Sequence, residues 1–117
     1  MRKQPALPIV LDSEIETPVM RAVLVAVTAL PGVMAWRNQT GAGRTVDGRW
    51  ISFGLKGSAD IIGACRGRAI AIETKRPRGG RWEEQQQRFA KAWCAAGGVY
   101  VLARSVDEAL AALASIP

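Results

Sequence analysis

The sequence contains no histidine, and this absence excludes more chemistry than any other feature of its composition. Without an imidazole there can be no Ser-His-Asp or Cys-His nucleophilic site, no histidine general base and no histidine metal ligand. Catalysis would have to use carboxylates, lysine, hydroxyl groups or thiols. A metal held by carboxylates and water would then be a hard cation such as Mg²⁺ or Mn²⁺.

Cysteine and long apolar runs are also scarce. Cys65 and Cys94 are the only two cysteines, and they form neither a C-x-x-C pair nor a zinc-type spacing. We therefore expect two reduced thiols and neither a disulfide framework nor a structural zinc. No run approaches the roughly 18 apolar residues of a membrane span, and the first residues lack the pattern of a signal peptide. A soluble cytoplasmic protein is expected.

The chain of 117 residues, 49% of them hydrophobic, suits one domain with one core. Its formal net charge is +6, and residues 37–91 hold twelve Lys or Arg against five Asp or Glu, which gives +7 there. A basic surface of this kind attracts polyanions such as nucleic acids without preferring a base sequence. The alternative at this point is a solvated basic surface that aids solubility.

The first half of the chain shows one clear helical pattern. Residues 1–13 have two prolines and little periodicity, so a flexible arm is expected. Apolar residues recur at helical spacing over residues 14–30, and a short apolar run at 33–36 predicts a strand. Residues 37–56 contain four glycines and predict a long functional loop, with a possible strand or turn at 50–53.

The second half predicts a hairpin followed by alternating helices and strands. Two apolar runs flank Arg66 and Gly67, as in an antiparallel hairpin. Residues 14–117 are therefore expected to form a single α/β domain in which helices flank a central mixed sheet, in the order α-β-(β)-β-β-α-β-α. The expected elements of this half are strands at 59–64 and 68–75, a helix at 82–96, a strand at 99–103 and a final helix to 115, opened by a capping box at 105–108.

The predicted hairpin carries the most informative group of charged residues. In a strand ending at residue 75, Glu73 and Lys75 lie on the same face, about 7 Å apart, while the other face is apolar. Asp60 begins the preceding strand, so a turn near Arg66 can bring it close to them. Two adjacent carboxylates repel each other unless a cation lies between them, and a nearby lysine can orient water or stabilise charge on a phosphate. These are the groups required for phosphodiester hydrolysis.

The Glu-x-Lys spacing alone is weak, because an edge strand often ends in an exposed Glu and Lys that form a surface pair. Asp60, after the Gly57 turn, strengthens the case. Five segments in this order resemble the virus-type replication-repair nuclease domain (VRR-NUC) of the PD-(D/E)XK superfamily, over about residues 14–105. They are Glu16, WRNQTG at 36–41, GSAD at 57–60, IETK at 72–75 and QQRF at 86–89.

The resemblance implies a restriction-endonuclease-like fold and Mg²⁺- or Mn²⁺-dependent cleavage of branched, flapped or junction DNA, typically by a homodimer. It also implies that Asp60, Glu73 and Glu16 bind the metal, that Lys75 is the catalytic lysine, and that Gln86 faces this site. Ala59 stands where the family usually has proline, which affects the turn but not the ligand. Glu14 remains an alternative to Glu16.

Helical spacing bears on the choice among three consecutive glutamines. Gln86 lies four residues after Trp82 and three before Phe89, on the expected apolar stripe, whereas Gln85 and Gln87 turn away from it. A polar residue on such a stripe needs a partner, and the site could supply one. The alternative is a glutamine at the edge of the stripe that reaches solvent.

Several cations are candidates for contacts with the DNA backbone, although a solvated strand end or a plain basic turn would look similar. Trp50 and Trp82 could stack on bases, but we expect them in the core. The glycines at 41–48 match no phosphate-binding loop, so no nucleotide cofactor is expected. The candidate DNA-binding residues are Arg37, Asn38, Lys56, Arg76, Arg78 and Arg81.

The function expected is a metal-dependent endonuclease acting on structured DNA in replication, repair or recombination. A non-catalytic basic DNA-binding module is the first alternative, and it would bind DNA in a salt-sensitive way without cutting it. Carboxylates within a DNA-binding surface argue against this alternative, because they repel phosphate unless a metal intervenes. A junction resolvase or a restriction-type enzyme of the same superfamily is the second alternative.

Overall fold

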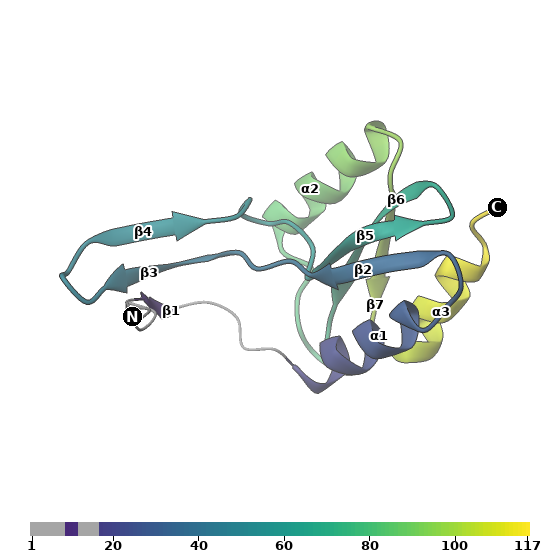
Figure 1. The fold of residues 1–117 in the computed structure, drawn as a ribbon, viewed down its shortest axis with the longest axis horizontal. Helices are drawn as coiled ribbons and strands as arrows, with labels where there is room; N and C mark the ends of the chain where they lie inside the picture. The colour runs from purple at the N-terminus through teal and green to yellow at the C-terminus, as the bar shows by residue number, and fades with distance from the viewer. Residues whose placement is uncertain (1–8, 12–16) are drawn as a thin grey trace, which may run out of the picture.

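A computed structural model describes residues 9–11 and 17–117, and its strands form two separate sheets. A four-stranded sheet, in the order β2-β5-β6-β7, lies in the body with the helices, and a three-stranded sheet, β1-β3-β4, projects from it (Figure 1). The elements are β1 (Ile9–Leu11), α1 (Pro18–Thr28), β2 (Val33–Arg37), β3 (Gly41–Thr45), β4 (Trp50–Phe53), β5 (Ile61–Cys65), β6 (Arg68–Thr74), α2 (Glu84–Ala95), β7 (Val99–Ala103) and α3 (Val106–Ala114).

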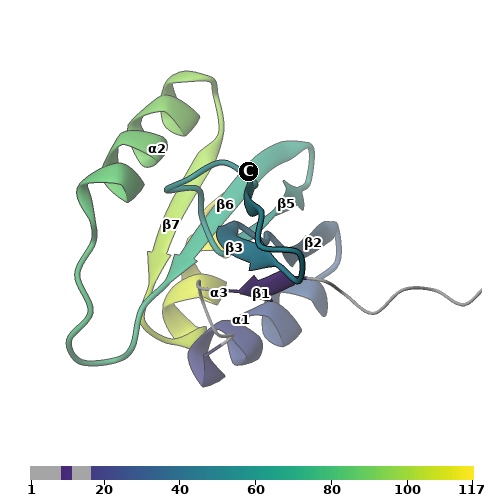
Figure 2. The same cartoon turned by 90° about the vertical axis from the view of Figure 1, so that its left-hand side faces the viewer.

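The body confirms the expected mixed sheet flanked by helices. Strands β2, β5 and β6 are antiparallel neighbours, while β7 runs parallel to β6 after the crossover through α2. Helices α1 and α3 pack together against one face, and α2 lies against β7 on the other side (Figure 2). The core lies between the sheet and helices α1 and α3, and its largest fully buried side chains include Val23, Val27, Ile61, Ile70, Ile72 and Leu113.

The hairpin between β5 and β6 follows the predicted pairing. Arg66 and Gly67 both have positive φ, 47° and 85°, as in the two-residue turns whose twist matches that of the flanking strands. The register pairs Ile61 with Ile72. One step further along the two strands, Asp60 and Glu73 therefore lie opposite each other.

Capping side chains mark where helices α1 and α3 begin. Thr17 caps α1, and its Oγ1 accepts a hydrogen bond from Met20 N at 3.1 Å. Ser105 caps α3 and accepts a hydrogen bond from Glu108 N at 3.1 Å, which is one half of the predicted capping box; Glu108 Oε1 accepts from Arg104 N at 2.6 Å in place of Ser105 N. None of the helices in the described ranges is long and apolar enough to cross a membrane.

The predicted loop at 37–56 is wrong, because most of this segment forms the β3–β4 hairpin. The possible strand at 50–53 is present as β4, but β3 was missed. Gly41, Ala42 and Gly43 have low strand propensity, and only their pairing with β4 and β1 makes them a strand. Of the expected N-terminal arm, only residues 9–11 lie in the described ranges, where they form β1 beside β3.

The core placement expected for two tryptophans is also wrong. Trp50 on β4 is 56% exposed and Trp82, ahead of α2, is 38% exposed. Trp50 lies on the projecting hairpin, outside the reach of the body's core, and Trp82 packs at the edge of the body against Tyr100, with ring centroids 6.1 Å apart. Their hydrophobicity was a poor guide because the core is built almost entirely from aliphatic side chains.

Candidate active site

The residues singled out from the hairpin and from α2 meet at one end of the body sheet. Asp60 immediately precedes β5, Glu73 lies near the end of β6, and Lys75 follows that strand. Together with Gln86 from the first turn of α2, they line one cavity of about 250 Å³. The rest of its lining is Thr17, Met20, Thr40, Gly57, Ser58 and Thr74.

Glu73 is the most buried charged group of the cavity, with 3% of its surface exposed. Its Oε2 lies 3.3 Å from Lys75 Nζ and accepts a hydrogen bond from Gln86 Nε2 at 2.7 Å. Burying a carboxylate is costly unless it is paired and hydrogen-bonded. Lys75 and Gln86 reduce that cost and fix the direction in which the carboxylate points.

Gln86 is held at both ends of its amide group. Its Oε1 accepts a hydrogen bond from Glu83 N at 2.9 Å, at the start of α2, so its Nε2 is the atom left to point at Glu73. The neighbouring Gln85 and Gln87 are exposed, and Gln87 Nε2 donates to Trp82 O at 2.8 Å instead. Of the three glutamines, Gln86 is the one that reaches this site.

Asp60 is fixed by β6 and by the end of β2. Its Oδ2 accepts two hydrogen bonds from Thr74, from N at 2.9 Å and from Oγ1 at 2.8 Å. Its backbone oxygen accepts a hydrogen bond from Asn38 N at 2.7 Å. Among the residues that the structure describes, none donates a hydrogen bond to Oδ1, so this oxygen is available to a ligand.

The turn before Asp60 is positioned by Asn38 and by Gly57. Asn38 Nδ2 donates to Ser58 Oγ at 2.7 Å and to Ala59 O at 2.9 Å, so this amide group is occupied in holding the turn. A Cβ atom on Gly57 would lie 2.7 Å from Gln85 O, and its φ of 86° also favours glycine. The turn can therefore pack directly against the start of α2.

The donor set of the cavity fits a hard divalent cation. Mg²⁺ is commonly held by one or two carboxylates, with water and substrate phosphate completing its shell. Asp60 and Glu73 supply that number, although the described part of the chain contains no group of three or more His, Cys, Asp or Glu that could hold a metal. Glu16 and its alternative Glu14 lie outside the described residues, while Thr17, next in sequence, lines the cavity.

The turn that follows Lys75 carries cations near the cavity. Arg76 and Arg78 are exposed and, with Thr17 and Pro18, line a neighbouring hollow of about 530 Å³. Arg104 Nη1 donates to Arg76 O at 2.9 Å and to Gly79 O at 2.7 Å, which holds this turn in place. Thr17 lines both hollows, so these two arginines border the candidate site.

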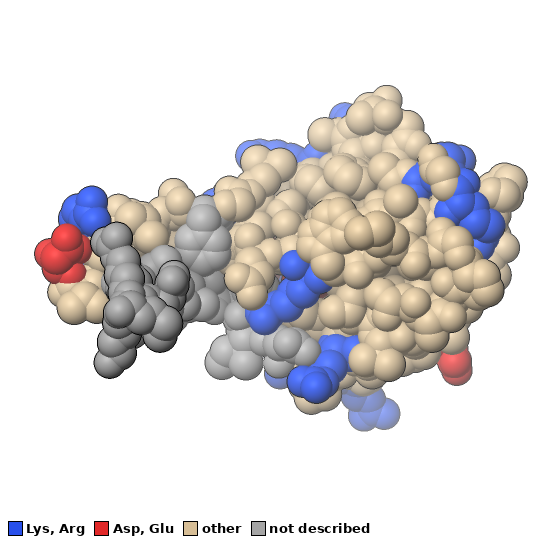
Figure 3. All heavy atoms as spheres, viewed as in Figure 1, with Lys and Arg blue, Asp and Glu red and all other residues tan. Residues whose placement is uncertain are grey.

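The other candidate DNA-binding cations are more scattered. Lys56 and Arg81 are exposed, and Arg37 is half-buried at the end of β2. Figure 3 shows Lys and Arg side chains in several separate places on the face of the molecule that it presents to the viewer.

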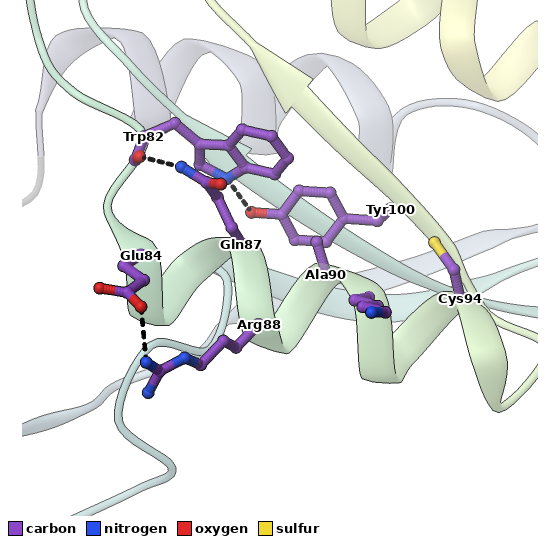
Figure 4. Close-up of a pocket in the computed structure, with 8 residues that line it drawn as sticks. Trp82, Glu84, Gln87, Arg88, Ala90, Cys94 and Tyr100 are labelled. Carbon is purple, nitrogen blue, oxygen red and sulfur yellow. Dashed lines mark hydrogen bonds and ion pairs between the residues drawn. The ribbon is translucent and has the colours of Figure 1, made fainter.

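A second cavity, of about 500 Å³, lies on the other side of α2 and differs in character (Figure 4). Trp82 and Tyr100 form its wall, with Trp82 Nε1 donating to Tyr100 Oη at 3.2 Å. Burial raises the pKa of Tyr100 to about 12. Glu84 is the only carboxylate residue in its lining and pairs with Arg88 at 2.6 Å, so this cavity lacks the paired carboxylates of the first.

Sequence reasoning missed three residues that position the site. Thr74 was assigned to the apolar face of its strand, and its only signal was a hydroxyl group at a buried position, which needs a partner. Asn38 was named as a candidate DNA contact, and its part in holding the turn before Asp60 through its amide group was not predicted. Arg104 carries no signal in the sequence, because its partners are backbone oxygens more than twenty residues away.

Comparisons with known proteins leave the family of this chain open. No protein-family model matches it, and no curated protein or solved structure matches it. The function of the cavity must therefore be inferred from its own side chains.

Proposed function

We propose that this chain is a Mg²⁺- or Mn²⁺-dependent endonuclease that hydrolyses DNA phosphodiester bonds, with branched, flapped or junction DNA as its substrate. One observation carries the proposal. Asp60, Glu73, Lys75 and Gln86 come from three different parts of the chain and line one cavity, with Lys75 Nζ 3.3 Å from Glu73 Oε2. A carboxylate pair that can bind a metal ion, together with an adjacent lysine, provides groups that can catalyse phosphodiester hydrolysis.

Each side chain has a distinct part in this chemistry. Asp60 and Glu73 would hold the cation, which when bound supplies a Lewis acid and activates water for attack on phosphorus. Thr74 fixes Asp60 through two hydrogen bonds, and Gln86 fixes Glu73. Lys75 places a positive charge at the cavity, where it can donate a hydrogen bond to the attacked phosphate and stabilise the developing negative charge.

The basic residues around the cavity support a polyanionic substrate. Arg76, Arg78 and Arg81 follow Lys75 directly, and all three are exposed. Cations of this kind bind the phosphate backbone and contribute no preference for a base sequence. Selectivity would then come from the shape of the DNA, in agreement with the branched substrates that the sequence resemblance suggests.

A homodimer is part of the proposal, since two copies can address the two strands of a junction. Strand β2 lies at an edge of the body sheet and exposes Met34 by 72% and Trp36 by 51%. Exposed apolar side chains on a sheet edge favour contact with another protein surface.

Cleavage of flap, junction and plain duplex DNA with Mg²⁺ or Mn²⁺ tests the proposed function. Asp60→Asn and Lys75→Met should each lose about 10³-fold in cleavage rate, because each removes a group that acts on the reacting phosphate. Asp107→Asn and Lys91→Met make the same chemical changes at exposed positions of α3 and α2 and should cleave like the wild type. Circular dichroism is used to check that all four variants are folded.

Equal cleavage by the wild type and both site variants would overturn the proposal. Salt-sensitive DNA binding by the wild type without cleavage in either metal would instead support the non-catalytic DNA-binding module. Glu16→Gln and Glu14→Gln in the same assay identify which acid before α1 takes part.

A further inference from the structure

The projecting β3–β4 hairpin begins and ends at the candidate active site. It leaves the body after β2 and returns before β5 (Figure 1). Residues next to both of its ends, Thr40 on one side and Gly57 and Ser58 on the other, line the cavity. Asn38, at one end, donates to Ser58 Oγ and Ala59 O at the other. Thr40, two residues further on, lines the cavity itself. The base of this hairpin, which we call the arm (residues 41–53), therefore borders the cavity.

The two faces of the arm differ. Gly43 and Thr45 are buried on one face. Arg44 and Trp50 are directly opposite each other on the other face, and both are exposed. The register also places Ala42 and Ser52 on this open face. The open face therefore combines a cation and a large aromatic ring with the small side chains of Ala42 and Ser52.

Arg44 and Trp50 form one unit. The guanidinium carbon of Arg44 lies 5.8 Å from the centroid of the Trp50 ring, and Arg44 Nη1 donates to Gly48 O at 2.9 Å. Arg49, at the tip, forms an exposed ion pair with Asp47 at 3.2 Å, whereas Arg44 is in no ion pair with the residues that the structure describes. Arg44 is thus the cation of the arm that can serve an anion outside the chain, and the adjacent indole offers a surface for a sugar or a base.

We propose that the arm is a second DNA-binding element, in which Arg44 and Trp50 hold the sugar-phosphate backbone of the substrate beside the cleaved bond. This proposal rests on the proposed nuclease function. Arg44 lies four residue steps along the extended chain from Thr40 at the cavity, a distance of about 13 Å. At roughly 3.4 Å per base pair, the contact lies about four base pairs from the scissile phosphate.

DNA binding by matched arginine variants tests this proposal. Arg44→Gln and Trp50→Ala are compared with Arg68→Gln, which makes the same charge change at the far end of the sheet, where Arg68 is exposed. Binding of a fluorescent flap substrate is measured in the Lys75→Met background, so that the DNA stays uncut. Each arm variant should raise Kd on the order of tenfold, and Arg44→Gln should reduce the slope of log K against log salt by about one, unlike Arg68→Gln.

The length of the substrate tests the position of the contact. In otherwise wild-type enzyme, Arg44→Gln should raise KM and leave kcat close to the wild-type value on long duplex arms. When the duplex on either side of the cleaved bond is shortened in turn below about four base pairs, the variant and the wild type should become equal on one side. No such convergence on either side overturns the placement.

Two further results would overturn the arm proposal. Equal losses from Arg44→Gln and Arg68→Gln would mean that total charge, and not the arm, determines affinity. A shift of Trp50→Ala from dimer to monomer in light scattering, with unchanged DNA affinity per chain, would assign the open face to contact between copies. If the wild type does not cleave DNA at all, the nuclease proposal fails, while the binding contrast still decides whether the arm holds DNA.

Discussion

The two ends of the body sheet carry charged side chains in different ways. At one end, the Glu73 carboxylate lies between Lys75 and Gln86 at the wall of a cavity. At the other end, Arg66 occupies the β5–β6 turn, and its Nη2 donates to Leu113 O at 2.6 Å and to Ile116 O at 2.7 Å. Glu73 and Arg66 are therefore both held by neighbouring groups, and Glu73 lines the candidate active-site cavity.

The partners explain the difference. Arg66 binds backbone oxygens at the C-terminal end of α3, where a helix favours a positive charge, and these bonds join the turn to the end of the chain. Glu73 is held by two side chains that also line the cavity, so its charge remains directed at whatever enters. At the turn end, the hydrogen bonds of Arg66 stabilise the fold. At the site end, the folded structure holds the Glu73 carboxylate in a fixed position.

Among the substitutions that test this difference between the two ends, Glu73→Gln should have the largest effect. The change removes a metal ligand, so cleavage should fall by about 10³-fold, which corresponds to roughly 4 kcal/mol. It also removes the repulsion between the adjacent carboxylates of Glu73 and Asp60, while the glutamine keeps the shape of the side chain and an oxygen that can accept hydrogen bonds from Lys75 and Gln86, so the thermal midpoint should change little. Single-turnover cleavage and thermal unfolding measure the two effects.

Glu84→Gln, at an exposed position of α2, is the matched control and should change neither quantity. A large drop in the thermal midpoint of Glu73→Gln would contradict the comparison, because it would make the site end a structural element like the turn end.

Arg66→Asn should have the opposite effect. Asparagine tolerates the positive φ of this turn, so the substitution removes the two hydrogen bonds of Arg66 with little backbone strain. Because the group is charged but partly solvated, the free energy of unfolding should fall by about 2 kcal/mol, while the cleavage rate per folded molecule is unchanged. Urea unfolding measures the loss. Arg68→Gln should cost less than about 0.5 kcal/mol, and equal losses from the two changes would remove the special role of Arg66.

The placement of the site side chains could be predicted because it follows from local rules. Strand alternation puts Glu73 and Lys75 on one face, and a two-residue turn at Arg66 brings Asp60 opposite Glu73. Helical spacing identifies Gln86 as the glutamine directed at the sheet. These steps require only the side-chain periodicity of a single strand or helix and the length of one turn.

The arm and the supports of the site could not be predicted in this way. Strand β3 begins with Gly41, Ala42 and Gly43, which show no strand pattern, and it is defined by its partners β1 and β4. Arg66 and Arg104 bind backbone oxygens that lie far away in sequence. Contacts of this kind depend on how elements pack together, and no local period encodes them.

The pKa of Tyr100 should show the smallest of the expected effects. Tyr100 is the only tyrosine of the chain and lies between the two ends of the sheet, so its titration can report on the charge at either end. Burial raises the pKa of its phenol to about 12 from an ordinary value of 10.0, and the charges of Glu73 and Asp60 add to the increase, while the hydrogen bond from Trp82 opposes it. The folded state thus holds this proton more tightly than the unfolded state. The stability that it contributes is full below pH 10 and is lost as the pH rises toward 12.

Near-ultraviolet absorbance of the phenolate follows this titration directly, and unfolding in guanidinium should return the pKa to about 10. Glu73→Gln should lower the pKa of Tyr100 by a small amount, since a nearby negative charge is removed, whereas Arg66→Asn should leave it unchanged. Identical titration of Tyr100 in the wild type and in Glu73→Gln would show that the charge of Glu73 has no electrostatic effect on Tyr100. A shift in Arg66→Asn alone would reverse the assignment of the two ends.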